Sequence, residues 1–242
     1  MKGWRTRIGF LLPPGNPTVE PEMTELTPPG VSLHFTRMYA EGPAGTHTGQ
    51  EQRNQSQVES IPACVRLLAM VSPSVIVMAH TATSYMLGEA REAALVAEME
   101  AIGNSRFITA FGSVMAAFGA LGIRRVAYAT PYSAEMTAQG KRHLEHCGIS
   151  VVSSGHLANV SNIYEESAER AYAIGRQVNH PDADAIFLSG VGMPTLDALQ
   201  PLEADTGKPV ISAASAMMWH ALRTAGINHG FDGYGKLLSG KF

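Results

Sequence analysis

Four short segments rich in hydroxyl, glycine and proline residues carry the side chains that could do chemistry. They span residues 13–18 (PPGNPT), 80–85 (HTATSY), 131–133 (PYS) and 190–195 (GVGMPT), and each follows an apolar run of strand length. Hydroxyl groups and the free backbone N–H groups of a helix start bind anions. Together the segments predict a small anion held by neutral donors, although each one alone is equally typical of helix caps and turns.

His80 is the only residue of these segments whose side chain titrates near neutral pH. It directly follows the apolar run 74–79 (SVIVMA), which places its ring at the floor of a cleft. A histidine there can act as a general acid or base. It can equally be a packed, hydrogen-bonded residue, and both interpretations stay open at this point.

The sequence signals for a cofactor or a metal are weak. Gly190 and Gly192 partly imitate a dinucleotide-binding fingerprint, but the third glycine is missing. His143, His146 and Cys147 lie close together on one predicted helix, with no further ligands beside them in the sequence. We therefore expect no cofactor and no metal ion.

Apolar runs of strand length alternate with stretches of helical periodicity along the chain. The predicted strands span residues 7–12, 31–38, 74–79, 106–108, 125–130, 150–154, 185–189 and 209–212. The predicted helices span residues 50–70, 88–102, 113–121, 134–147, 163–179, 196–205 and 213–224. This alternation indicates an α/β fold with doubly wound parallel sheets, in which ligands bind beyond the carboxyl ends of the strands.

The chain also contains an internal repeat. Residues 7–13 (RIGFLLP) align with 125–131 (RVAYATP), and residues 74–82 (SVIVMAHTA) align with 184–192 (DAIFLSGVG). Two matches in the same order favour duplication over chance similarity of apolar strands. We expect two pseudo-symmetric Rossmann-like halves, residues 1–113 with 214–242 and residues 114–213, with the active site in the cleft between them. His80 and Gly190 then occupy equivalent strand ends.

The composition fits a globular protein and argues against several classes. The 242 residues carry a formal net charge of −3 and are 45% apolar, which argues against a nucleic-acid-binding face and against disorder. The apolar runs are too short for a membrane span or a secretory signal. Cys64 and Cys147 form neither a disulfide framework nor a zinc spacing. We expect a cytoplasmic protein without nucleic-acid or membrane partners.

The four segments resemble the aspartate/glutamate racemase superfamily, in its maleate isomerase and arylmalonate decarboxylase branch. Residues 7–22 (RIGFLLPPGNPTVEPE) are similar to the opening of that branch, and residues 129–132 (ATPY) to its Thr-Pro-Tyr motif. Residues 79–84 (AHTATS) and 188–195 (LSGVGMPT) are similar to its two cysteine segments. The similarity spans nearly the whole chain, but His80 and Gly190 stand where the family has its cysteines.

The resemblance implies a cofactor-free enzyme acting on a small carboxylate, in a family whose members are often homo-oligomers. The family holds the carboxylate with hydroxyl groups and backbone amides. Carried over by position, the substrate-binding residues are Pro14, Asn16, Thr81, Ala82, Tyr132, Asn162, Gly190 and Val191, and the catalytic residues are His80 and Tyr132.

The absence of both family cysteines bears on the reaction. Cis–trans isomerisation in this family adds a thiolate to a double bond, and racemisation needs a group on each face, which Gly190 does not offer. Decarboxylation through an enediolate held by neutral donors needs one proton donor, for which His80 is available. The expected function is a cofactor-independent, decarboxylase-like lyase acting on a malonate-like or other small dicarboxylate. Two alternatives stay open: an isomerase, racemase or hydrolase that uses His80 in place of the thiol, and a carboxylate-binding protein without catalysis.

Overall fold

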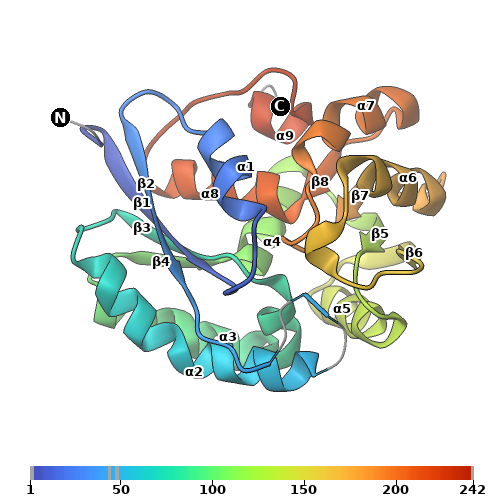
Figure 1. Ribbon diagram of the computed structural model, residues 1–242. Helices are drawn as coiled ribbons and strands as arrows, with labels where there is room; N and C mark the ends of the chain where they lie inside the picture. Colours follow the sequence, from blue (N-terminus) through green and yellow to red (C-terminus); the bar gives the residue numbers. More distant parts are fainter. Residues whose placement is uncertain (1–2, 43–44, 47–48, 241–242) are drawn as a thin grey trace.

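Two four-stranded parallel sheets form the framework of the computed structural model, which describes residues 3–42, 45–46 and 49–240 (Figure 1). The first sheet has the order β2-β1-β3-β4 and the second the order β6-β5-β7-β8. The strands of the first sheet are β1 (Thr6–Leu12), β2 (Val31–Arg37), β3 (Val75–Met78) and β4 (Arg106–Thr109). Those of the second are β5 (Arg125–Thr130), β6 (Ser150–His156), β7 (Ala185–Leu188) and β8 (Val210–Ser212).

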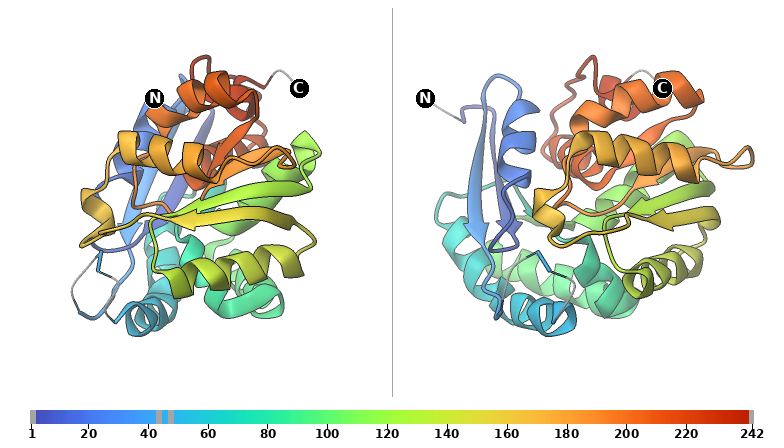
Figure 2. Two further views of the ribbon diagram at one scale, coloured as in Figure 1. Left: turned by 90° about the vertical axis from the view of Figure 1, so that its right-hand side faces the viewer. Right: turned by 45° about the vertical axis from the view of Figure 1, so that its right-hand side comes forward.

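The two sheets repeat one topology, which confirms the α/β fold class predicted from the alternation of strands and helices. β1 pairs in parallel with β2 and β3, and β5 pairs in the same way with β6 and β7. The inner strands β3 and β7 are buried along their whole length, because helices cover both faces of a parallel sheet. Figure 2 shows the two sheets side by side, with helices packed around both.

Helices follow the strands in nearly every crossover. They are α1 (Val19–Glu25), α2 (Gln50–Ala69), α3 (Thr81–Gly103), α4 (Ala110–Leu121), α5 (Ala134–His146), α6 (Ala168–Val178), α7 (Leu196–Thr206), α8 (Ala213–Thr224) and α9 (Gly235–Ser239), with a 3₁₀ turn η1 (Ile163–Glu165). The helices α2 and α3 pack against the first sheet on one side, and α1 and α8 pack on the other.

Several helices differ from the sequence prediction. α3 begins at Thr81 and not at residue 88, because the hydroxyl-rich segment after β3 already forms helical turns, and the helix kinks at Gly88, where φ is +72°. The predicted helix 163–179 is divided into η1 and α6. The short helices α1 and α9 were not predicted, since neither has enough residues for a periodic pattern.

The C-terminal helices connect the two halves. α8 packs against α4, β3 and β4 and also against β8, whereas α9 lies against α7, α8 and β8. Because α8 contacts both sheets, these contacts do not assign residues 214–242 to one half. The division of the chain into 1–113 with 214–242 and 114–213 stays a sequence-based prediction. Within the described residues, no helix is both long and apolar enough to span a membrane.

Candidate active site

Hydroxyl groups join the first turns of α3 to the loops that follow β5 and β7 in the second sheet. Thr81 Oγ1 and Tyr132 Oη are 3.0 Å apart, and Tyr85 Oη and Ser189 Oγ are 2.8 Å apart. All four side chains are buried. Burial raises the pKa of Tyr85 to about 12 and that of Tyr132 further still, so both phenols stay protonated and can donate hydrogen bonds. The predicted neutral donors Thr81 and Tyr132 thus meet where the two halves join.

The loop after β1 holds the loop after β7. Asn16 Nδ2 donates to the Val191 carbonyl over 2.9 Å, and Thr18 Oγ1 donates to the Gly192 carbonyl over 2.8 Å. The Asn16 Oδ1 atom accepts from the backbone N–H groups of Thr18 and Val19 at the start of α1. The Asn16 side chain therefore connects the two halves, and its amide has a second N–H beyond the one bonded to Val191.

Glu22 strengthens the same connection from α1. Its Oε1 atom accepts from the backbone N–H groups of Thr195 and Leu196 over 2.6 and 3.0 Å, at the start of α7. Because the carboxyl group is buried, its pKa is raised to about 7. The sequence analysis placed Glu22 only in a family motif and missed this role, which depends on a contact between the two halves.

His80 is buried at the end of β3 with an extended backbone, directly before the first turn of α3. Its Nδ1 atom lies 2.6 Å from Thr83 Oγ1, whereas Nε2 makes no hydrogen bond within the described part of the chain. Burial, followed by the nearby charge of Arg53, lowers the pKa of His80 to about 4. The imidazole is therefore neutral at pH 7, and the bond with Thr83 decides which ring nitrogen bears the proton.

Gly190, the counterpart of His80, leaves little space for a side chain. Its φ is +92°, a left-handed value that L side chains rarely adopt. A Cβ atom there would lie 3.1 Å from the ring of Pro131 and 3.2 Å from Tyr132 Oη. The site is therefore asymmetric: the first strand end has a titratable side chain, and the second offers only its backbone and Tyr132.

The remaining predicted residues have mixed surroundings. Ala82 lies buried in the first turn of α3 and Val191 is buried after β7, where both can offer backbone N–H groups. Pro14 is half-buried, and its carbonyl accepts from Arg37. Asn162 Oδ1 caps η1 by accepting from Tyr164 N.

Arg53 is a cation beside the site that the sequence analysis did not predict. It lies on α2, is only 6% exposed, and donates through Nη2 to the Thr46 carbonyl. Its charge lowers the pKa of His80 and acts against the burial that raises the pKa of Tyr164. A positive charge therefore contributes to the electrostatic environment of His80, which the sequence does not signal.

The two thiols of the chain lie away from these strand ends. Cys64 is buried on α2 near the carbonyl of Arg37, and Cys147 caps the end of α5. Burial raises the pKa of both thiols. Among the described residues, no cluster of His, Cys, Asp and Glu side chains has a metal-binding arrangement.

Comparison with known proteins assigns the family. The family model for arylmalonate decarboxylase matches residues 8–238. The maleate isomerase of Nocardia farcinica is 31% identical, over 96% of this chain and 95% of its own length. The arylmalonate decarboxylase of Bordetella bronchiseptica is 29% identical, over 95% of each chain.

A solved structure supports the same assignment. The Nocardia farcinica maleate cis-trans isomerase mutant with a covalently bound succinylcysteine intermediate superposes with a TM-score of 0.88. The sequences are 26% identical, and the match covers 98% of this chain and 99% of that one. These findings confirm the resemblance noted in the sequence: the chain belongs to the arylmalonate decarboxylase family of enzymes, which includes decarboxylases and isomerases.

Proposed function

We propose that the protein isomerises a small unsaturated dicarboxylate of the maleate class, with His80 in place of a thiolate nucleophile. The observation that carries this proposal is the neutral, buried His80 with Nδ1 bonded to Thr83 and Nε2 unbonded within the described residues. When Nδ1–H donates to Thr83 Oγ1, Nε2 has a lone pair. A lone pair on a fixed side chain can attack an electron-poor double bond.

The reaction balances without another reactant. The Nε2 lone pair forms an N–C bond to one alkene carbon, and the π electrons of the double bond move to the distal carboxylate, which becomes an enediolate. Thr81, Tyr132 and the N–H of Ala82 can donate to this enediolate. The former double bond is now single and rotates, after which the electrons return, the N–C bond breaks and the trans isomer leaves.

The family supports covalent chemistry of this kind. The Nocardia farcinica isomerase structure contains a succinyl group on cysteine, and the corresponding adduct here would be a succinylhistidine. Burial, followed by the positive charge of Arg53, keeps the free imidazole unprotonated, so the Nε2 lone pair is available as a nucleophile.

Conversion of maleate to fumarate, followed by proton NMR, tests the proposal. His80→Ala should lower the rate by at least about 10³-fold, because the nucleophile is lost. His80→Cys should keep or raise the rate, because it supplies the family's thiol at that position. His146→Ala is the matched control, since this histidine is exposed on α5. Absence of fumarate with the wild-type protein, or an unchanged rate in His80→Ala, would refute the proposal.

Decarboxylation of a malonate is the second candidate, favoured by the absence of a side chain at Gly190 and of a thiol at either strand end. In the other tautomer Thr83 donates to Nδ1, and Nε2–H faces the substrate as the single proton donor. Carbon dioxide released from malonates, with deuterium gained at the α carbon in heavy water, would support this reaction. Binding without either conversion would indicate a carboxylate-binding protein.

A further inference from the structure

The helix α3 consists of two segments that meet at Gly88. This residue has φ of +72° and ψ of +169°, a backbone conformation that is essentially restricted to glycine. A Cβ atom there would meet no atom of a more distant residue within 4 Å, so the backbone conformation, and not crowding, requires the glycine. Residues 81–87 therefore form a separate short segment before the longer segment 89–103.

The short segment carries groups that act at the reacting end of β3. Thr83 Oγ1 lies 2.6 Å from His80 Nδ1, and Thr81 Oγ1 lies 3.0 Å from Tyr132 Oη in the second half. The first contact decides which nitrogen of the imidazole bears the proton. The second brings two hydroxyl donors together. A movement of the short segment would therefore change both the tautomer of the histidine and the position of the donors.

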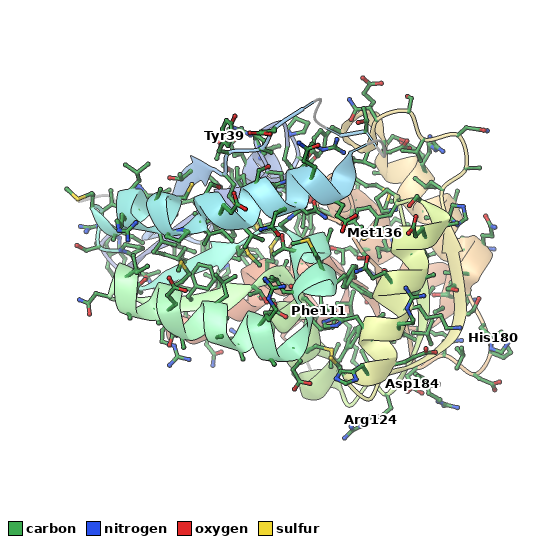
Figure 3. The ribbon with its side chains drawn as sticks, turned by 90° about the horizontal axis from the view of Figure 1, so that it is seen from below. Tyr39, Phe111, Arg124, Met136, His180 and Asp184 are labelled. Carbon is green, nitrogen blue, oxygen red and sulfur yellow. The ribbon has the colours of Figure 1, made fainter. Side chains whose placement is uncertain are left out.

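The second half of the fold holds one side of the short segment. Tyr85 Oη lies 2.8 Å from Ser189 Oγ, and the Tyr85 carbonyl accepts from Gln139 Nε2 of α5 over 3.2 Å. The Tyr85 ring also packs edge-on against Phe111, which lies between α3 and α5, with ring centroids 5.7 Å apart (Figure 3). These contacts leave Ser84 to hold the short segment on the side of its own helix.

Ser84 connects the short segment to the longer one. Its hydroxyl group donates to Glu92 Oε1 over 2.7 Å, and among the described residues this is the one side-chain hydrogen bond that crosses the kink. Eight residues of a straight α-helix span about 12 Å along the axis, so the bond exists only because the chain turns at Gly88. Ser84 is fully buried and Glu92 is only 9% exposed, and a hydrogen bond is electrostatically stronger in such surroundings than in water.

Glu92 is a costly residue at this position. A glutamate is rarely so buried without a cation, and none of the ion pairs between the described residues involves Glu92. It borders a hollow of about 390 Å³ that Phe107, Ile108 and His220 also line, so water there can hydrate the second carboxylate oxygen. An apolar residue would avoid the cost of burying a charge, so a carboxylate here indicates a role in holding Ser84.

We propose that Glu92 is a positioning residue for the reaction at His80. By holding Ser84 across the kink it fixes the short segment, so that Thr83 keeps its bond to His80 and the hydroxyl of Thr81 stays in place. Glu92 acts through this one bond and does not touch the substrate. The proposal rests on the proposed function in one respect, because the reaction that Glu92 supports is the one assigned to His80.

Steady-state kinetics with maleate test the proposal. Glu92→Ala and Ser84→Ala should each lower kcat by about 10–100-fold and change KM less, because misplaced reacting groups lower the rate. Glu92→Gln keeps an oxygen acceptor for Ser84 and should stay within about twofold of the wild type. The double variant Ser84→Ala/Glu92→Ala should lose no more than either single variant, since both remove one bond. Glu98→Ala is the matched control, at an exposed position on the same helix.

The protonation of His80 gives a second measurement that needs no turnover. Nitrogen-15 NMR of the imidazole, assigned with His80→Gln, should show one tautomer in the wild type and a pKa of about 4. Glu92→Ala should populate both tautomers and raise the pKa of His80 towards 6.5, because a loosened segment admits water to the ring. Loss of the Glu92 charge alone would lower this pKa, so a rise has to come from movement of the segment. Glu92→Gln should keep the wild-type spectrum.

Three results would overturn the proposal. They are an unchanged His80 spectrum in Glu92→Ala, equal losses in Glu92→Gln and Glu92→Ala, and additive losses of kcat in the double variant. Thermal unfolding of each variant identifies loss of folding. If Glu92→Ala does not fold, Ser84→Ala decides the outcome by the same two measurements.

The failure of this proposal is distinguishable from failure of the proposed function. If maleate is not isomerised but the His80 spectrum changes in Glu92→Ala and not in Glu92→Gln, the positioning role stands and the isomerase proposal falls. If maleate is isomerised through His80 but Glu92→Ala leaves both the rate and the spectrum unchanged, the isomerase proposal stands and the positioning role falls.

Discussion

Replacing Glu22 with Gln should remove one pH-dependent contribution to the stability of the fold. The carboxyl group connects α1 to the start of α7 through the N–H groups of Thr195 and Leu196. Its second oxygen is buried without a partner among the described residues. Burial is the main cause that raises its pKa to about 7, and the charges of Glu25 and Asp197 raise it further. The Gln side chain keeps an oxygen acceptor for the two N–H groups and does not ionise.

The sign of the effect follows from proton linkage. A carboxyl group with a higher pKa in the folded state than in the unfolded state stabilises the fold at low pH, and this stability is lost as the pH rises. For Glu22 the loss occurs between its ordinary pKa of 4.5 and about 7. At 1.36 kcal/mol for each pH unit, the full effect is about 3 kcal/mol. This value is an upper limit for the change in the free energy of unfolding, because water that reaches the ionised Glu22 reduces the cost of burying its charge.

Urea unfolding of the wild type and of Glu22→Gln over a pH series measures this effect. The free energy of unfolding of the variant should exceed that of the wild type by about 3 kcal/mol above pH 7, and the difference should vanish near about pH 4.5. Histidines with a lowered pKa, such as His80 and His143, make the fold more stable as the pH rises. Both proteins contain them, so this contribution cancels in the difference between the variant and the wild type. Glu98→Gln, at an exposed position on α3, is the control. A difference that is constant with pH would refute the reasoning.

Three further predictions concern the strand ends. Tyr132→Phe should weaken succinate binding about tenfold in a calorimetric titration, because one hydroxyl donor to a charged group is lost; unchanged affinity would remove Tyr132 from the site. Gly190→Ala should lower the free energy of unfolding by about 1–2 kcal/mol, because an alanine is strained at a φ of +92°. The melting temperature should fall by roughly 2–8 °C, and an unchanged melting temperature would contradict this prediction. The kcat/KM for maleate should fall as the pH drops through about 4, where His80 gains a proton; a midpoint near pH 6.5 would show that His80 does not control the rate.

The repeated framework could be predicted from the sequence because its signals are local. β1, β3, β5 and β7 are apolar runs followed by turn-forming residues, and the two alignments already pair His80 with Gly190. The hydroxyls of Thr81 and Tyr132 come directly after such strands, so the topology alone brings them to one edge.

Arg53 and Glu22 could not be predicted, because their roles depend on contacts between distant segments. Arg53 stands in a polar run, residues 49–57 (GQEQRNQSQ), which is typical of a solvated helix face. In the fold it is buried and donates to the Thr46 carbonyl, a burial that the polar run does not signal. The role of Asn16 is also hard to predict from the sequence, because an amide can bind a carboxylate or bond to the backbone equally well. In the structure its amide donates to the Val191 carbonyl, and its oxygen accepts from the backbone at the start of α1.

The asymmetry of the two strand ends limits the reactions that this family fold can perform here. His80 has φ of −153°, an extended conformation that any residue adopts, so the chain can place a nucleophile or a proton donor at that end. At the opposite end, Gly190 combines a left-handed backbone with close contacts to Pro131 and Tyr132 that leave little space for a Cβ atom. A side chain at position 190 would add strain from the left-handed backbone and would need Pro131 or Tyr132 to shift by a few tenths of an ångström. The left-handed backbone and the close contacts at Gly190 therefore support the proposal that the chemistry of this site is one-sided and takes place at His80.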